Sequence, residues 1–431
     1  MFGNIRRHRW LVLVMSLALI AGACGRDDGG GGTGAGSGGG DGEVASSPGI
    51  TDTSIKIGAS YPLSGPASGY ATIARALEAC VDWTNAEGGV DVGDGKTRDL
   101  ELTVYDDAYD PAKAVQNAKR LVEQDEVFAL VNPLGTPSNT AIVDYMNEQE
   151  VPHVFLATGA SKWGATPEEW PWTIGWQPAY SLEAAVYGEF LKESHPGATV
   201  AVLFQNDDYG EDYLSGFESA IEGSDIEIIA RESYEVADPS VDSQVVNLAQ
   251  SDADVFFNIT TPKFAAQAIK AVGGTGWDPI HLLNSVSGSV ESVLKPAGLE
   301  NAEGIYSALY LKEPSDATWD DDEAMVEYKA LGEKYGDFNV EDPFGLFAFA
   351  ICDTVKKTLE NMEAPTRDAF MESVHNLDLE LPLLLPGINV KTGEGDAFPI
   401  ESMQLRQFTG GEWVIQGEIV SYEGATPIPG E

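Results

Sequence analysis

The residue types that most often perform catalysis are few and scattered in this chain. His153, His195, His281 and His375 are isolated, and none lies in an H-E-x-x-H pattern or beside a cysteine. The chain has no G-x-S-x-G motif, the turn that presents the nucleophilic serine of α/β hydrolases. The sequence therefore offers no nucleophile–base pair, and it predicts a protein that is not an enzyme.

Two further stretches imitate binding motifs but fail in their context. The GDGKT segment (93–97) resembles the end of a P-loop, yet Val90 stands where the first glycine is required. Asp106, Asp107 and Asp110 form a short acidic cluster at a predicted strand-to-helix turn, where helix capping explains it. We therefore expect neither a metal ion nor a cofactor.

The first residues have the pattern of an export signal that ends at a cysteine. Three arginines and no acid precede a short apolar run, and small residues precede Cys24. The run is shorter than the ~20 apolar residues of a transmembrane helix, so residues 1–23 are typical of a secretory signal peptide. A cysteine at this place resembles the bacterial lipoprotein signal, in which it is lipidated. The alternative is ordinary secretion, because Ala21 stands where lipoprotein signals usually have Leu, Val or Ile.

Composition supports an anchor at the membrane. Residues 24–53 are rich in glycine, which predicts a flexible tether behind the lipidated cysteine. The chain has 25 Lys and Arg against 69 Asp and Glu, a formal net charge of −44. Such acidity argues against nucleic acid as a partner and against adhesion to anionic lipid through charge. We therefore expect the lipid on Cys24 to hold the protein outside the cell, on the outer face of the membrane.

Strand-like and helix-like segments alternate along the rest of the chain. The predicted strands are 54–58, 100–107, 127–131, 151–157, 199–205, 226–234, 254–260 and 280–284, with a β-rich tail at 398–422. The predicted helices are 70–87, 110–124, 136–149, 211–222, a helix through Leu248, 262–272 and 344–361. Asp110 and Thr136 each precede a proline and are expected N-caps. The alternation predicts an α/β fold with doubly wound parallel sheets, split into two lobes near 175–180.

Hydrogen-bonding residues with little charge gather after the predicted strands. Ligands of open α/β sheets bind beyond the carboxyl ends of the strands, where helix N-termini point. The loops at those ends are SYPLSGPASGY (60–70), NPLGTPSN (132–139), ATGASKW (157–163), QNDDYGED (205–212), ITTPKF (259–264) and NSVSG (284–288). Their Ser, Thr, Tyr and Asn side chains predict a polar binding cleft.

Five segments resemble the leucine/isoleucine/valine-binding family, the extracytoplasmic substrate-binding proteins of ABC transporters. The segments are IKIGASYPLSGPASGY, ACVDWTNAEGGV, LTVYDDAYDPAKAVQNAKRLV, PSNTAIVDYMNEQEVPHVF and VLFQNDDYGEDYLSGF. The resemblance covers roughly residues 54–420 and implies the periplasmic binding protein type I fold, with two lobes joined by a three-strand hinge. It implies that 54–176 and 310–402 form the first lobe, and that 177–309 and 403–431 form the second.

The resemblance also implies a function. The protein is expected to capture a small polar solute between its lobes, in the first place an amino acid of the branched-chain type. It would then deliver the solute, as a monomer, to the permease subunits of an ABC importer. Two alternatives are a binder of amide, urea-like or aromatic acid solutes, and an ectodomain that senses a solute and signals.

Site residues are carried over from the family position by position. They are Tyr70, Thr136, Ser138, Thr158, Gly159, Ala160, Tyr209, Thr261 and Ser285. Tyr70 and Tyr209 match aromatic walls of the pocket, and Thr136 matches a hydroxyl that holds the ligand carboxylate at a helix start. The loop of residues 158–160 matches one that binds both carboxylate and ammonium.

Two of these positions depart from the family pattern. Thr261 stands where amino-acid binders often have a tyrosine, and Ser285 stands where they have an acid that pairs with the ammonium. An ammonium buried without a carboxylate loses a charge-assisted hydrogen bond worth ~1.5–3 kcal/mol. A neutral amide, or an acid that lacks an amine, is therefore expected to fit at least as well as an amino acid.

Cys80 and Cys352 remain after the predicted removal of the signal peptide. Cys80 lies on the apolar face of the first predicted helix, and Cys352 lies on the last helix, 344–361. With the 2-1-3-4-5 strand order that the resemblance implies, these helices cover the same face of the first sheet. Neighbouring helix axes 8–10 Å apart permit the Cα separation of ~5.5–6 Å that a disulfide needs. The alternative is a pair of buried free thiols.

Overall fold

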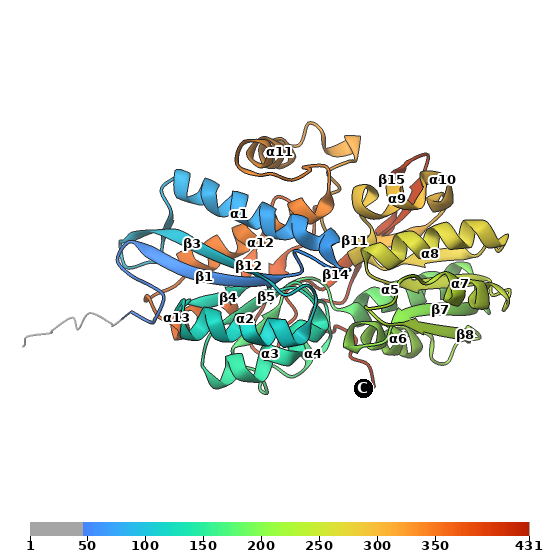
Figure 1. Ribbon diagram of the computed structural model, residues 1–431, viewed down its shortest axis with the longest axis horizontal. Coiled ribbons are helices and arrows are strands. Elements are labelled where there is room, and N and C mark those ends of the chain that lie inside the picture. Colours follow the sequence, from blue (N-terminus) through green and yellow to red (C-terminus); the bar gives the residue numbers. More distant parts are fainter. Residues whose placement is uncertain (1–45, 431) are drawn as a thin grey trace, which may run out of the picture. The chain divides into compact units, whose positions relative to one another are not determined.

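The structure, a computed structural model, describes residues 46–430, which form two sheets covered by helices (Figure 1). The predicted signal peptide, Cys24 and most of the predicted linker lie outside the described residues. The last part of that linker is packed on the fold. The Ser47 N–H donates to Pro365 O at 3.0 Å, and Ile50 is buried. The prediction of a flexible tether up to residue 53 is therefore wrong for residues 47–53, since this part of the chain is hydrogen-bonded to the folded part and Ile50 is buried there.

The first sheet has six strands and is parallel except at one edge. In spatial order the strands are β2 (Val90–Asp91), β3 (Thr97–Asp106), β1 (Ser54–Tyr61), β4 (Ala129–Val131), β5 (His153–Leu156) and β6 (Thr173–Gly175). Only β2 is antiparallel to its neighbour. The three residues of β4 are all buried, as expected of a strand covered on both faces. Without the short β2, the order is the predicted 2-1-3-4-5.

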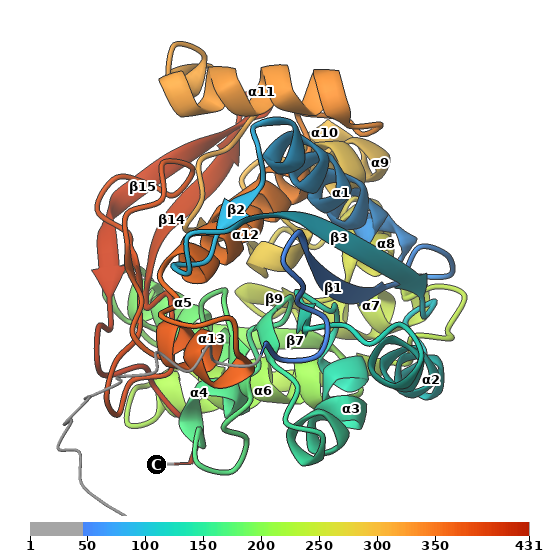
Figure 2. The same cartoon turned by 90° about the vertical axis from the view of Figure 1, so that its left-hand side faces the viewer.

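Helices cover both faces of this sheet. The helices of this lobe are α1 (Ala71–Ala86), α2 (Pro111–Glu123), α3 (Thr136–Glu148), α4 (Lys162–Ala165), α11 (Glu323–Tyr335), α12 (Pro343–Glu360) and α13 (Arg367–Val374). α1 packs on α12, and α2 packs on α3 (Figure 1). α11 lies on the outer side of α1 (Figure 2). Thus segments more than 250 residues apart in the chain share one face of the first sheet.

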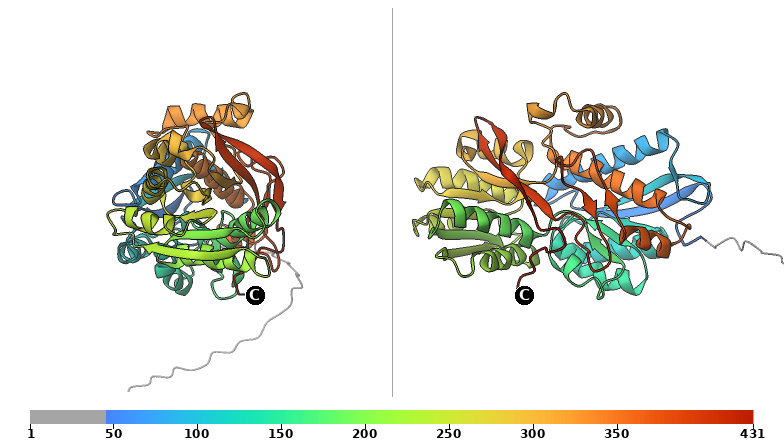
Figure 3. Two further views of the ribbon diagram at one scale, coloured as in Figure 1. Left: turned by 90° about the vertical axis from the view of Figure 1, so that its right-hand side faces the viewer. Right: turned by 180° about the vertical axis from the view of Figure 1, so that it is seen from behind.

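The second sheet has seven strands. In spatial order they are β15 (Glu412–Ser421), β14 (Ser402–Thr409), β11 (Tyr306–Leu309), β10 (Ile280–Leu283), β9 (Val255–Ile259), β7 (Thr199–Gln205) and β8 (Glu227–Tyr234). β7 to β11 are parallel to one another, and when they are numbered 1 to 5 along the chain their spatial order is again 2-1-3-4-5. β14 and β15 extend the sheet with antiparallel pairing. The two C-terminal strands lie side by side, in red in Figure 3. The β-rich tail and the doubly wound parallel sheets are confirmed, and antiparallel strands are added at one edge of each sheet.

The second sheet carries its own helices. They are α5 (Tyr180–Ser194), α6 (Asp208–Ile221), α7 (Asp242–Ala249), α8 (Pro262–Thr275), α9 (Lys295–Ala297) and α10 (Leu299–Ala302). α5 packs on α6, and α7 packs on α8. The remaining short elements are η1 (Ser68–Tyr70), η2 (Ser285–Ser287), the π-helix η3 (Val290–Leu294), η4 (Ala317–Trp319) and a hairpin of β12 (Asp378–Leu379) and β13 (Val390–Lys391).

The chain passes between the two sheets three times. It leaves the first sheet between β6 and α5, returns to the first-lobe helices after β11, and re-enters the second sheet at β14. Each sheet with its helices is called a lobe below. The second and third connections adjoin neighbouring strands, since β11 pairs with β14.

Of the two predicted N-caps, the structure confirms Asp110 and shows that Thr136 is wrong. Asp110 caps α2, since its carboxylate accepts the Ala112 N–H at 2.9 Å. Thr136 does not cap α3. Gly135 is the N-cap, with a φ of 99° that favours glycine, and Thr136 is the first helical residue. The Thr136 hydroxyl therefore does not cap the helix, and it forms a hydrogen bond with the Thr158 hydroxyl instead.

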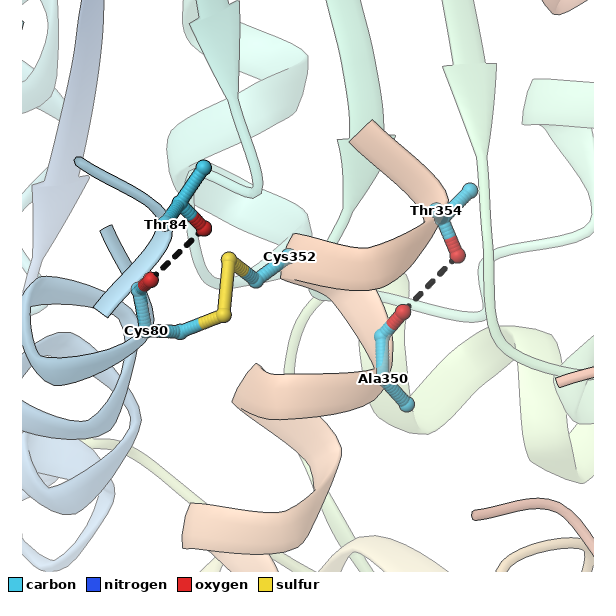
Figure 4. The surroundings of a disulfide bond; sticks show 5 residues. All are labelled: Cys80, Thr84, Ala350, Cys352 and Thr354. Carbon is cyan, nitrogen blue, oxygen red and sulfur yellow. Dashed lines mark hydrogen bonds between the residues drawn. A yellow bond between two sulfur atoms is a disulfide. The ribbon is translucent and has the colours of Figure 1, made fainter. Parts of the chain in front are cut away.

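Cys80 and Cys352 are joined by a disulfide (Figure 4). Their Cα atoms lie 6.3 Å apart, and the bridge connects α1 to α12 across 272 residues of sequence. Both cysteines are buried in the apolar contact between these helices. The bridge closes a loop that includes the entire second-lobe sheet except β14 and β15.

Within residues 46–430, no helix is both long enough and apolar enough to cross a membrane.

Candidate ligand-binding site

A pocket lies between the two lobes, where their connections meet. It holds about 850 Å³ of space free of protein atoms, its open mouth included. Its lining residues are Tyr70, Ile73, Tyr109, Leu134, Gly135, Ala157, Gln177, Tyr180, Tyr209, Thr261, Ser285, Val286, Ser289, Ala308, Leu309, Tyr310, Leu311, Lys312, Glu313, Pro343, Phe344, Phe347 and Arg406. They come from both lobes and from two of the connections, so a change in the angle between the lobes would open or close the pocket.

Aromatic rings form a large part of the pocket wall. Five tyrosines and two phenylalanines line it. Tyr180 and Tyr209 contact edge to face with ring centres 5.3 Å apart, and Tyr70 packs against Phe344 at 5.1 Å. Such rings supply large apolar area with few rotatable bonds, and their hydroxyls add a small number of polar points. The wall therefore suits an organic solute with an apolar body.

Helix starts place several of these rings. The Asp207 carboxylate caps α6 by accepting the N–H groups of Tyr209 and Gly210, which puts the Tyr209 ring in the first turn. This cap also explains why α6 begins at Asp208, three residues before the predicted start. In the same way Asp342 caps α12 and places Phe344 in its first turn.

The polar groups of the second lobe reach the pocket. The Tyr209 side chain is buried, and its hydroxyl has no hydrogen-bond partner among the described residues. Burial raises the pKa of the Tyr209 phenol well above its usual value, so the group stays neutral. The hydroxyl of Thr261 lies 3.3 Å from that of Tyr234, and the Ser285 hydroxyl donates to Glu183 at 2.5 Å.

The charged groups of the pocket are already paired. Arg406 donates to the Glu313 carboxylate at 2.8 Å, and both side chains are buried. The Arg406 guanidinium also lies over the Trp413 ring. Lys312 pairs with Asp322 at 2.6 Å. No carboxylate among the described lining residues is therefore free to receive a ligand ammonium.

The predicted carboxylate site of the first lobe is closed off. The hydroxyls of Thr136 and Thr158 bond each other at 2.6 Å, and both residues are buried. The Tyr180 N–H donates to Gly159 O at 2.7 Å, and a Cβ on Gly159 would lie 2.9 Å from two carbons of the Tyr180 ring. Burial raises the pKa of Tyr180 to about 12, although hydrogen bonds from Thr158, Gly159 and Thr136 oppose the rise. The Tyr180 side chain thus fills the space above this loop.

Comparison with known proteins decides the family. The family model described as "Periplasmic binding protein" matches residues 54–412. The chain belongs to the periplasmic binding protein family. Proteins of this family are the extracytoplasmic solute-binding components of ABC transporters and are not enzymes.

Relatives differ in what they bind. The leucine-, isoleucine-, valine-, threonine- and alanine-binding protein of Pseudomonas aeruginosa is 25% identical over 199 residues, which are 46% of this chain and 51% of that protein. The matched region therefore spans about half the length of that relative.

Two solved structures share the fold. The valine-bound branched-chain amino acid ABC transporter protein of Thermus thermophilus has a TM-score of 0.76 at 15% identity, covering 86% of this chain and 97% of that one. The fatty acid transporter protein of Thermomonospora curvata has a TM-score of 0.75 at 20% identity, covering 89% and 98%.

The predicted site residues of this family member divide into two groups. Tyr70, Tyr209, Thr261 and Ser285 line the pocket. The five that do not are Thr136, Ser138, Thr158, Gly159 and Ala160. Thr136 and Ser138 lie in the first turn of α3, and Thr158, Gly159 and Ala160 lie in the loop after β5. Their neighbours Gly135 and Ala157 do line the pocket.

Several lining residues were missed from the sequence. Tyr180 is the first residue of α5, Tyr310 directly follows β11, Arg406 lies in β14, and Phe344 and Phe347 lie at the start of α12. The first three lie close to the points where the chain passes between the lobes, which the alternation of strands and helices does not reveal. The one available signal was the aromatic run in FGLFAFA (344–350), which reads equally well as a helix core.

Proposed function

We propose that this protein captures an organic solute between its lobes and delivers it to the permease subunits of an ABC importer. The observation that carries the proposal is the pocket, because residues of both lobes and of two connections between them form its walls. A solute bound there would stabilise one angle between the lobes, which a permease could recognise. The family membership supports transport as the purpose of binding.

The pocket favours an amide-type or aromatic acid solute over an α-amino acid. Two relatives carry names that specify amino acids, which supports the branched-chain reading of the sequence. In this chain, however, Tyr180 lies against Gly159, and the Thr136 and Thr158 hydroxyls are occupied. The carboxylates among the described lining residues are paired as well. An α-carboxylate and an ammonium would thus both lack their expected partners.

A thermal-shift screen of the full-length protein tests the ligand class. The panel contains leucine and valine, their amides and deaminated acids, and benzoate with benzamide. A ligand at 100 times its dissociation constant adds ~2.7 kcal/mol to the free energy of unfolding. We expect stabilisation by an amide or an aromatic acid. Stabilisation by leucine or valine alone would restore the amino-acid assignment.

Delivery to an importer is tested in cells. Deleting the gene should abolish uptake of the solute found in the screen, and a copy with the wild-type sequence should restore it. Unchanged uptake would contradict the transport role.

The lipid anchor at Cys24 is part of the proposal. It is supported by the arginines, the apolar run and the small residues before that cysteine. Cys24→Ala should release the protein into the medium or leave it unprocessed, which fractionation of cells and medium would show. Membrane association equal to that of the wild type would contradict an anchor at this residue.

A further inference from the structure

Glu183 is a buried carboxylate that the pocket lining does not include. It lies in the first turn of α5, and 2% of its surface is exposed. Four groups stand within donor distance of its two oxygens. Oε1 accepts from the Ser285 N–H at 2.6 Å and from Tyr187 at 2.7 Å. Oε2 accepts from the Ser285 hydroxyl at 2.5 Å and from Tyr213 at 2.8 Å.

These donors stabilise the ionised form of the carboxylate against its burial. Burial raises the pKa of Glu183 above its usual value, and the hydrogen bonds from Ser285, Tyr187 and Tyr213 offset part of that rise. A carboxylate can only accept hydrogen bonds, and every group around it can donate one. The Arg406 guanidinium adds an opposite charge in the same region. A buried charge with this many partners is costly to disturb.

The consequence falls on Ser285, which does line the pocket. A serine hydroxyl has one proton and two lone pairs. Since the proton of Ser285 points to Glu183, the oxygen can meet a solute only as an acceptor. A hydroxyl that donates to a carboxylate is also a stronger acceptor, because hydrogen bonds in a chain polarise one another.

We infer that Ser285 selects for an N–H or O–H donor on the solute, and that Glu183 is the positioning residue that fixes this polarity. The inference rests on the proposed function, since it concerns the same pocket, and it narrows the solute to one with a donor group. Carboxamides and urea-like compounds have such a donor, whereas esters and ionised acids do not. The negative charge stands one hydrogen bond behind the pocket surface, which suits a neutral donor.

Matched neutral probes test this polarity. N-methylbenzamide and methyl benzoate have nearly the same shape and differ in an N–H where the ester has an oxygen, as do N-methylisovaleramide and methyl isovalerate. Calorimetry with the full-length protein should give an amide preference of about tenfold or more in at least one pair, as expected for a hydrogen bond assisted by charge. The measured quantity is the ratio of the two dissociation constants.

Two variants separate positioning from packing. In Glu183→Gln the side-chain amide can donate to the Ser285 oxygen, so the serine proton is free to turn toward the solute. The amide preference should then fall below about threefold, since less than ~0.7 kcal/mol would remain. Tyr213→Phe is the control, because it removes a different donor from Glu183 and leaves the Ser285 contact in place. It should keep the preference of the wild type.

The possible outcomes distinguish failure of the Ser285 inference from failure of the proposed function. Ser285→Ala should also abolish the preference, and it serves as the second test if Glu183→Gln does not fold. A preference that survives in Ser285→Ala overturns the inference. Equal binding of amide and ester by the wild type also overturns it, while the proposed solute-binding function stands. Failure of the wild type to bind either pair, together with failure of the broader screen, contradicts the proposed ligand class itself.

Discussion

The first-lobe loops around Thr136 and Thr158 and the second-lobe loops around Tyr209 and Ser285 contain similar residue types at equivalent strand ends. Their polar groups nevertheless have different surroundings. In the first lobe the two threonine hydroxyls bond each other at 2.6 Å, and Tyr180 covers the loop that follows. In the second lobe the Tyr209 hydroxyl has no partner among the described residues, and Ser285 lines the pocket. Residue type alone therefore does not identify a binding loop, because one bulky neighbour can close it.

This comparison separates two kinds of effect. Changes in the first-lobe loops around Thr136 and Thr158, or in the disulfide, should alter stability and leave solute affinity nearly unchanged. Changes in the second-lobe wall should alter affinity and leave stability nearly unchanged. The predictions below follow that division, from the largest expected effect to the smallest, and use the solute identified by the screen.

Removal of the disulfide should have the largest effect, and on stability alone. In the Cys80→Ala/Cys352→Ala double variant the free energy of unfolding should fall by ~2–5 kcal/mol, because the unfolded chain is no longer cross-linked. Urea unfolding monitored by tryptophan fluorescence measures this. The affinity of this double variant for the solute should stay within about twofold of the wild-type value, since neither cysteine lines the pocket. A large loss of affinity with little loss of stability would contradict the division.

Truncation of Tyr209 should have the largest effect on affinity. Tyr209→Ala removes an aromatic wall of the pocket and should weaken binding by ~2–3 kcal/mol, in the range of other buried aromatic anchors. Tyr209→Phe keeps the ring and should cost only ~0.5–1.5 kcal/mol if the free hydroxyl bonds the solute. Calorimetry on both variants separates ring from hydroxyl. Wild-type affinity in Tyr209→Ala would place the solute elsewhere.

Removal of a first-lobe hydroxyl should destabilise without weakening binding. Thr158→Val keeps the shape of the side chain but leaves the buried Thr136 hydroxyl with one partner fewer. The free energy of unfolding should fall by ~1–3 kcal/mol. Solute affinity should stay within about twofold, because Thr158 does not line the pocket. An affinity loss larger than the stability loss would show that this loop still contacts the solute.

The smallest effect is expected at the edge of the contact between the lobes. Lys162 of the first lobe pairs with Asp208 of the second at 2.7 Å, and both side chains are partly exposed. Exposed pairs contribute ~0–1 kcal/mol. Lys162→Met should therefore weaken binding by less than about fivefold, and the difference from the wild type should shrink at high salt. A difference that is unchanged at 1 M salt would exclude a role through charge.

The sequence predicted the fold well for identifiable reasons. Uniformly apolar strands such as Ala129–Val131 and the proline-started helices predicted the parallel α/β alternation. The strand order that the family resemblance implies placed Cys80 and Cys352 on neighbouring helices. Thr136 was wrongly predicted as an N-cap, since Gly135 has the φ that this loop requires. A positive φ at glycine cannot be read from residue type alone.

The pocket was predicted only in part. Tyr70 and Tyr209 follow strand ends, so local pattern and family resemblance both point to them. Tyr180 at the start of α5 and Arg406 in β14 line the pocket because of how the two lobes meet, which is information from contacts far apart in sequence. Glu183 was missed for the same reason. It lies 102 residues before Ser285, and only the packing of α5 on the second sheet brings the two together.

The central claim is that the solute binds to the second-lobe wall and not to the loops of the first lobe. A crystal structure of the protein with the tightest-binding solute of the screen tests it most directly. We predict that the solute lies within hydrogen-bond distance of the Ser285 or Tyr209 hydroxyl and that the Tyr180 ring stays above Gly159. A solute carboxylate bonded to Thr136 and to the loop of residues 158–160, with the Tyr180 ring moved away, would contradict the account.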